Sequence, residues 1–242
     1  MAELLELDGA KGDQLDYALA QVRPTSAERP GIADDVRARI ADCLSGKSAV
    51  AEALAWLEGS GIDVSHVRIV EGIAGDKRPA RTYLIDPPLR IGVVVSSEPT
   101  LASWREVWHE LGHAAFAACH DAGEAWSMRD APSPIVHEAF AELVAGQLER
   151  VGVLKQLLGV DTATAEQVAA WRRGRRQHWR EWLCDHVHEL TRPEGNARYL
   201  IADLLASQLR RQIGDEPRAL AATIRAAAQA GARYEWHGLL GQ

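Results

Sequence analysis

One short segment constrains this chain more than any other: His109-Glu110-Leu111-Gly112-His113, which reads H-E-x-x-H. It lies within an apolar run, residues 101–116, whose spacing predicts a helix. On a helix, residues i and i+4 lie on one face, about one turn apart. Both imidazoles can therefore reach one tetrahedral metal ion, and these residue types in this pattern favour zinc. The sequence predicts a helix that holds one Zn²⁺ per chain.

Glu110 is the expected catalytic base of this site. It is rotated off the line of the two histidines by one residue, which places it too far round to be a comfortable metal ligand. Its carboxylate can instead hold a metal-bound water and take its proton. The pattern therefore predicts zinc-dependent hydrolysis. A site of this kind needs one more protein ligand and one open coordination position.

An ordinary amphipathic helix with two half-buried histidines is the competing interpretation. The flanking residues favour the metal site, because Val107, Trp108 and Phe116 are typical of a buried helix. Gly112 costs a helix about 1 kcal/mol relative to alanine. Its presence indicates that another element, or a substrate, comes close to the helix at that point.

The third ligand is expected at the start of the helix that follows a loop at 121–134. This segment offers His137, Glu138 and Glu142. The spacing between His113 and Glu138 leaves room for a loop that lays a second helix beside the first. Glu142, one turn later, could accept the free N–H of a zinc-bound histidine and so fix its orientation. His137 is the competing ligand, and two solvated glutamates are the interpretation without a metal.

Composition is typical of a globular protein with one substantial core, since 47% of the 242 residues are apolar and 25% are charged. The net charge of −7 gives no basic field that would attract nucleic acid. No window approaches the roughly 18 apolar residues of a membrane-spanning helix, and the first residues lack the features of a signal peptide. Three widely spaced cysteines favour reduced thiols and a cytoplasmic protein.

The pattern of turns and apolar residues predicts a small strand region followed by a mostly helical body, which is a mainly α fold with a small β-sheet (α+β). Residues 1–32 are interrupted by glycine and proline and are expected to form a loosely structured N-terminal arm. Residues 33–242 are expected to form one domain. We expect strands at 64–72, 82–85 and 90–96. We expect helices at 34–44, 48–57, 101–116, about 135–158, 163–190, 196–213 and 216–230.

Three segments resemble the glutamate-zincin (gluzincin) metallopeptidases, in particular the angiotensin-converting-enzyme-like and oligoendopeptidase/thimet-like families. The segments are 108–114 around the H-E-x-x-H motif, 134–142 with its His-Glu-Ala, and 197–208 with Arg198-Tyr199. The likeness covers most of the chain, residues 82–242. It implies a zincin-like catalytic core built around an H-E-x-x-H active-site helix.

The resemblance also implies roles for individual residues. Glu138 would be the third zinc ligand beside the two motif histidines. Tyr199 would donate a hydrogen bond to the oxyanion of the reaction, with His188 or His186 beside it. Members of these families are usually much longer, with a second helical half that closes a deep channel. We therefore expect a more open cleft here, or one completed by a second copy of the chain in a homodimer.

The expected function is a zinc metallopeptidase that cleaves the amide bonds of short peptides. One alternative is a zincin scaffold that acts on a small amide-containing metabolite in biosynthesis, and another is a non-catalytic metal-binding protein.

If strand 90–96 lies at a sheet edge, it could pair with an extended peptide, and burial in the core is the other interpretation. We interpret the Arg- and Trp-rich stretch 171–182 as a helix with tryptophans in the core and arginines in water, and an anionic ligand or a nucleic-acid strand is the alternative.

Overall fold

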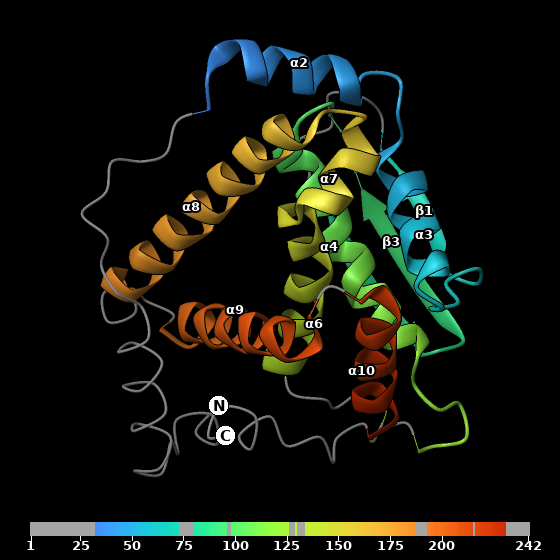
Figure 1. Cartoon of the computed structure of the whole chain (residues 1–242). Coiled ribbons are helices and arrows are strands. Elements are labelled where there is room, and N and C mark those ends of the chain that lie inside the picture. Colours follow the sequence, from blue (N-terminus) through green and yellow to red (C-terminus); the bar gives the residue numbers. More distant parts are fainter. Residues whose placement is uncertain are drawn as a thin grey trace.

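The computed structural model describes residues 32–72, 80–95, 98–125, 129, 134–186, 193–214 and 216–230, and it leaves the side chains of 185–186 and 193–197 undescribed. The expected N-terminal arm therefore lies, up to residue 31, outside the described residues. Figure 1 shows a mostly helical chain with a small mixed sheet. The elements are, in order, α2 (Asp34–Leu44), α3 (Ala49–Gly59), β1 (Arg68–Glu71), β2 (Arg81–Asp86), β3 (Arg90–Val95), α4 (Leu101–Ala118), α6 (Pro134–Ala145), the 3-10 helix η2 (Gly146–Glu149), α7 (Val151–Leu158), α8 (Thr162–His186), α9 (Pro193–Ile213) and α10 (Pro217–Ala230).

The expected α+β class is confirmed, with most of the elements close to their expected places. Helix α2 spans the predicted residues, and α3 begins one residue after Ser48, whose side chain accepts a hydrogen bond from the backbone N–H of Ala51 as an N-cap. Within the described part of the chain, no helix is long and apolar enough to cross a membrane.

The sheet has the strand order β1-β3-β2, with β1 parallel and β2 antiparallel to the central strand β3. The interpretation of 90–96 as an edge strand is therefore wrong, because β3 is paired on both sides. Its nearly continuous β-branched run suits a central strand better than an edge, where charges and bulges are common. On the described residues, β2 is an edge strand with β3 as its neighbour.

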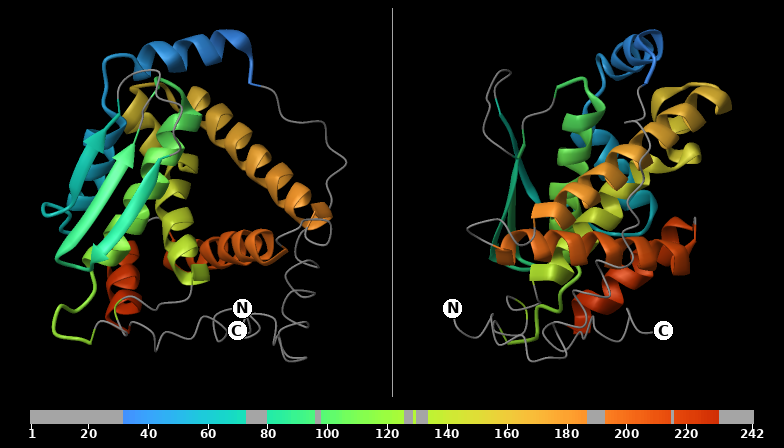
Figure 2. Two further views of the ribbon diagram at one scale, coloured as in Figure 1. Left: turned by 180° about the vertical axis from the view of Figure 1, so that it is seen from behind. Right: turned by 90° about the vertical axis from the view of Figure 1, so that its left-hand side faces the viewer.

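One face of the sheet packs against α4, and no described helix or strand covers the other, as the view along the sheet in Figure 2 shows. Ile91, Val93 and Val95 point to the inner face and are buried, and the period of two in a strand turns the intervening residues outward. On β2 the same alternation directs Thr82 and Leu84 towards α4 and leaves Tyr83 exposed. The sheet thus lines one side of the motif helix.

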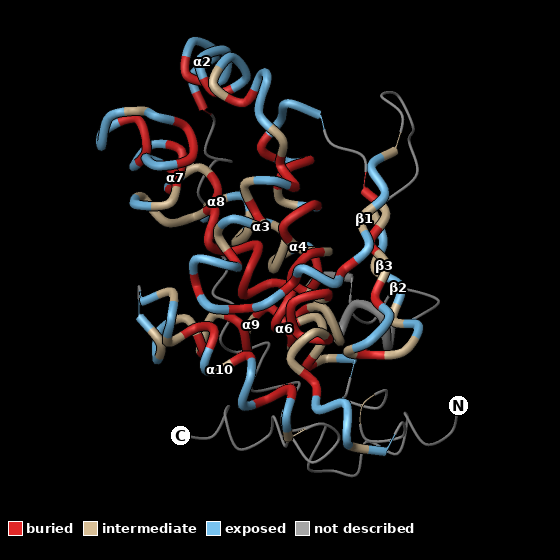
Figure 3. Tube along the Cα trace, turned by 90° about the vertical axis from the view of Figure 1, so that its right-hand side faces the viewer, coloured by how far each residue is buried: buried red, intermediate tan, exposed pale blue. Residues whose placement is uncertain are grey.

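Helix α4 is the centre of the core. Thr100 begins it as an N-cap, its side chain accepting a hydrogen bond from the backbone N–H of Ser103. The helix buries Trp104, Trp108 and Phe116, and it contacts β2 and β3 on one side and α6 on the other. Figure 3 shows the buried positions concentrated along α4 and α6. The motif therefore lies on a helix that other elements surround.

Helices α4 and α6 approach each other closely at Gly112. A Cβ on Gly112 would lie 2.8 Å from the Cα of Ala141 and 3.1 Å from the Cβ of Val144. The expectation that another element comes close to Gly112 is confirmed, and the element is α6. The absence of a side chain at this residue allows the two helices to bring their polar side chains together.

The expectation of a single helix at about 135–158 is wrong, because these residues form three elements, α6, η2 and α7. Arg150 has extended backbone angles, which end the helical hydrogen-bonding pattern between Glu149 and Val151. At Gly146 the guanidinium of Arg210 occupies the space that a Cβ would take. Tertiary contact with α9 therefore coincides with the change from α-helix to 3-10 helix, which helical periodicity cannot reveal.

The burial of side chains on α8 also differs from the expectation. Arginines were expected in water, but Arg172 is only 7% exposed and the Arg176 side chain only 9%, whereas Trp182 is exposed. Arg176 is held inside by ion pairs with Glu149 and Asp203, which come from η2 and α9. Pairing partners from elsewhere in the chain compensate for burial of a guanidinium.

Candidate metal centre

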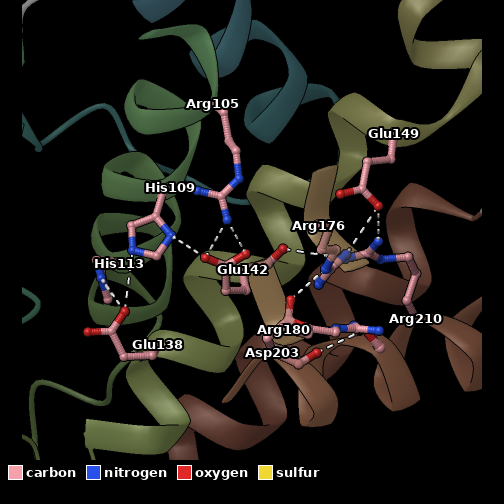
Figure 4. A network of polar contacts seen from close by, with 11 residues as sticks. Arg105, His109, His113, Glu138, Glu142, Glu149, Arg176, Arg180, Asp203 and Arg210 are labelled. Atoms are coloured by element: carbon pink, nitrogen blue, oxygen red, sulfur yellow. Dashed lines mark hydrogen bonds and ion pairs between the residues drawn. The ribbon is translucent and has the colours of Figure 1, made fainter. Parts of the chain in front are cut away.

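Three side chains converge where α4 faces α6. His109 and His113 come from α4 and Glu138 from the first turns of α6, and one ligand atom from each lies within 4.8 Å of the other two. The Oε2 of Glu138 is 3.3 Å from Nε2 of His109 and 3.7 Å from Nε2 of His113. The three side chains are between 12% and 15% exposed. Figure 4 shows them pointing at one another.

The geometry fits a tetrahedral metal ion. Zinc bonds of 2.0–2.2 Å to nitrogen and oxygen place neighbouring ligand atoms about 3.4 Å apart, close to the 3.3 and 3.7 Å that separate Glu138 from the two imidazoles. The Oε2 of Glu138 is buried, and among the described residues its polar neighbours are the two imidazole nitrogens, neither in regular hydrogen-bond geometry. Buried polar atoms are normally satisfied, so this oxygen, aimed between two imidazoles, has the environment of a metal ligand. The three residues therefore fit the metal that the motif predicts.

His137, the competing ligand, is not part of this cluster. Its ring packs edge-on against Phe116, with 4.8 Å between the ring centroids, and lies 6.1 Å from the ring of His113. Burial, with a further contribution from His113 and His120, lowers the pKa of His137 to about 3. His137 is therefore a neutral imidazole in an aromatic environment beside the cluster.

Glu142 lies one turn along α6 from Glu138 and contacts the other nitrogen of His109. Its Oε1 is 3.2 Å from Nδ1 of His109, and both of its oxygens accept hydrogen bonds of 2.6 Å from Nη2 of Arg105. Burial raises the pKa of Glu142, but Arg105 and His109 together outweigh burial and hold this pKa well below its usual range. The carboxylate is thus ionised and positioned to orient His109.

The two motif histidines have opposite electrostatic environments. Burial lowers the pKa of His109, but Glu138 and Glu142 outweigh burial and raise this pKa to about 9. Burial, together with the nearby charge on His109, lowers the pKa of His113 to about 4. Without a metal, the cluster thus carries its proton on His109, between two carboxylates. A bound cation would displace that proton, because a histidine must be unprotonated to bind a metal.

The carboxylate of Glu110 contacts β2. Its Oε2 accepts a 2.8 Å hydrogen bond from the hydroxyl of Thr82. Burial raises the pKa of Glu110, and the Thr82 hydrogen bond opposes part of that rise. Glu110 lines a cavity of about 350 Å³ together with His113 and Glu138 of the cluster. Its walls are Arg81, Thr82 and Leu84 of β2, Glu110 and His113 of α4, and Pro134, His137 and Glu138 of α6.

Tyr199, the expected hydrogen-bond donor to the oxyanion, is not among the residues that line this cavity. The ring of Tyr199 packs with Leu183 and Leu200 in a small separate cluster. His188 lies outside the described residues, and of His186 the structure describes the backbone at the end of α8. Instead, the neighbouring Arg198 reaches the cluster, with its Nη2 3.8 Å from Oε1 of Glu138.

Sequence reasoning missed Thr82, Arg105 and Arg198. Arg105 could have been found, because it precedes His109 by one helical turn and so lies on the metal-facing side of α4. Nothing in the local sequence marks Thr82, since a threonine in a strand is ordinary. Its role depends on β2 passing over α4, which is a tertiary contact.

Comparison with known proteins identifies no family. No protein-family model and no curated protein matches the sequence. Among solved structures, the chain resembles one described as "The Structure of CHT", with a TM-score of 0.55 and 13% sequence identity. The match covers 96% of this chain and 62% of that chain, so this chain spans less than two thirds of that protein's length. At this identity the likeness concerns the fold alone.

Proposed function

We propose that this chain is a zinc-dependent hydrolase of the gluzincin metallopeptidase type that cleaves amide bonds in short peptides. The observation that carries the proposal is the convergence of His109, His113 and Glu138 beside a cavity that Glu110 also lines. Three protein ligands with a carboxylate nearby form the arrangement of a hydrolytic zinc site. A zinc ion held there would supply an acidified water and polarise a carbonyl group.

Glu110 is the proton acceptor in this proposal. Burial raises its pKa, and a carboxylate with a raised pKa is a stronger base near neutral pH. Thr82 holds one oxygen of Glu110 and so fixes the direction of the carboxylate. After accepting a proton, Glu110 can donate it to the leaving nitrogen across the same cavity.

Strand β2 is the element that would align the substrate. It lines the cavity through Arg81, Thr82 and Leu84, and on the described residues β3 is its one neighbour in the sheet. An extended peptide can add to an edge strand through backbone hydrogen bonds. In this proposal β2, and not β3 as expected from the sequence, pairs with the extended peptide. A peptide bound along β2 would pass Glu110.

Metal analysis and the variant Glu110→Gln test the proposal. Purified protein should contain one zinc per chain, and E110Q should keep this zinc while its peptide hydrolysis falls about 100- to 10,000-fold. Glu58→Gln is the control, because Glu58 is exposed on α3, and it should leave zinc content and hydrolysis unchanged. Full hydrolytic activity in E110Q would contradict the proposed mechanism.

A small amide-containing metabolite is the second candidate substrate. The cavity at Glu110 measures about 350 Å³, near the lower end of the range of small-molecule sites, roughly 300–1,000 Å³. That volume favours a compact substrate over a long peptide. In this case a mixed peptide library would stay uncut while small N-acyl amino acids are hydrolysed, and the E110Q variant would abolish that hydrolysis.

A further inference from the structure

A second cavity, of about 420 Å³, lies between α4 and α8. Four arginines and two tryptophans dominate its walls: Arg105, Arg172, Arg175, Arg176, Trp171 and Trp179. The polar lining also includes two glutamates, Glu106 and Glu149. Cationic side chains thus outnumber anionic ones around this cavity, although the chain as a whole has a net charge of −7. Such a local excess of positive charge attracts anions.

Two of the four arginines are already neutralised by carboxylates. Arg105 binds both oxygens of Glu142. Arg176 pairs with Glu149 at 3.1 Å and with Asp203 on α9, and Figure 4 shows both arginines within one network of charged side chains. Glu149 is shared further, since Arg210 donates to it at 3.0 Å. The carboxylate that lines the cavity from η2 is therefore committed to two arginines.

Arg172 lacks such a partner among the described residues. The residue is 7% exposed, its Nη1 donates a 3.1 Å hydrogen bond to the backbone carbonyl of Leu101, and its Nε has no hydrogen-bond partner on the described part of the chain. Burial, and then the nearby charge of Arg105, lowers the pKa of Arg172 to about 10. Burying a cation without a counter-ion is unfavourable, so an anion in the cavity would relieve this cost.

Arg175 and the tryptophans complete the site. Arg175 is exposed, with its guanidinium carbon 5.8 Å from the centroid of the Trp171 ring, and on the described part of the chain no carboxylate forms an ion pair with it. A guanidinium stacked on an aromatic ring keeps its N–H groups directed sideways, where they can bind an oxyanion. Trp171 and Trp179, both partly buried, offer flat apolar surface in the same cavity.

We propose that this cavity binds an organic oxyanion, with its carboxylate or phosphate group on Arg172 and Arg175 and its flat organic part against Trp171 and Trp179. A single guanidinium can bind such a group through two parallel hydrogen bonds. The inference does not depend on hydrolysis. Its site is adjacent to the metal centre, because Arg105 precedes His109 by one turn, about 6 Å along α4, and the two residues share Glu142.

Equilibrium binding of small probes to the full chain tests this proposal. Calorimetry and tryptophan fluorescence measure the binding. The probes are benzoate, phenyl phosphate, inorganic phosphate and benzamide, which is the uncharged counterpart of benzoate. We expect one molecule of benzoate or phenyl phosphate to bind per chain, and the preferred one of the two identifies the group as carboxylate or phosphate. We expect inorganic phosphate to bind at least tenfold more weakly than phenyl phosphate, and benzamide not to bind.

Two variants and a control locate the binding. Arg175→Gln should weaken binding about tenfold and, because Arg175 is exposed, should leave the melting temperature unchanged. Arg172→Gln should weaken it further. Arg173→Gln is the control, since Arg173 is exposed on the same helix and does not line the cavity. The proposal is overturned if neither benzoate nor phenyl phosphate binds, or if benzamide binds as well as benzoate. It is also overturned if R175Q leaves the affinity for both organic anions unchanged, as it would if they bound at the metal centre.

Discussion

The Nη2 of Arg105 lies 2.6 Å from both carboxylate oxygens of Glu142, and one of these oxygens, Oε1, also lies 3.2 Å from Nδ1 of His109. Glu142 is 5% exposed, so its charge is stabilised by neighbouring side chains and not by water. Arg105 holds the carboxylate, the carboxylate orients the Nδ1 side of His109, and the opposite nitrogen of the ring faces Glu138. Contacts of this kind behind a metal ligand raise its basicity and fix its direction.

The variant Glu142→Gln should therefore weaken zinc binding. The amide keeps the shape of the side chain but removes the charge that His109 and Arg105 share, and loss of a comparable contact typically costs about 10- to 100-fold in metal affinity. Competition with a chromogenic chelator measures the affinity. Circular dichroism monitors folding, because Arg105 loses its counter-ion in this variant. An unchanged zinc affinity would show that Glu142 serves Arg105 alone.

The variant Gly112→Ala should destabilise the protein although alanine favours a helix by about 1 kcal/mol. The new Cβ would lie 2.8 Å from the Cα of Ala141, and overpacking of this kind typically costs about 1–3 kcal/mol. Because the contact joins α4 to α6, zinc affinity should fall as the histidines and Glu138 move apart. Urea unfolding and chelator competition measure the two effects.

Gly152→Ala is the matched control for this substitution. Gly152 lies in α7, and a Cβ there would meet no atom within 4 Å. Alanine should therefore be neutral or stabilising by up to about 1 kcal/mol, with no change in zinc affinity. Equal effects of the two substitutions on stability would contradict the close approach of α4 and α6.

The variant Glu149→Gln should lower stability in a pH-dependent way. Burial raises the pKa of Glu149, but Arg176 and Arg210 outweigh burial and lower it. The stabilisation is therefore fully present above the ordinary carboxyl pKa and is lost as the pH falls through the lower pKa of the folded protein. Breaking a buried ion pair costs about 3 kcal/mol, so the difference between E149Q and the wild type should be about that size at pH 7 and shrink on acidification.

Urea unfolding between pH 7 and pH 3 measures this difference. Glu166→Gln is the control, because Glu166 is exposed on α8 and surface substitutions usually change stability by less than about 0.5 kcal/mol. A difference between E149Q and the wild type that stays constant with pH would mean that Glu149 stabilises the fold by packing and not by its charge.

The sequence predicted the parts of this molecule that depend on local pattern. The periodicity around Trp108 and Phe116 predicts the helix α4. The four-residue spacing of His109 and His113 predicts that both lie on one face of that helix. What it could not predict depends on contacts between distant segments. The burial of Arg172, the break after α6 and the central place of β3 are decided by neighbours from other elements, and so is the packing of Tyr199 against Leu183 of α8.

The hydroxyl of Thr82 connects the sheet to the proposed catalytic base, and the variant Thr82→Val tests this connection. Its hydrogen bond to Glu110 lowers the pKa of that carboxyl against the effect of burial. Valine removes the donor at nearly constant volume, so the pKa of Glu110 should rise further. A base must be ionised to accept a proton, so the acidic limb of kcat/KM against pH should move to higher pH.

Zinc content should not change, because Thr82 is outside the ligand cluster. If the acidic limb stays in place while activity falls at every pH, Thr82 shapes the cavity without tuning the base.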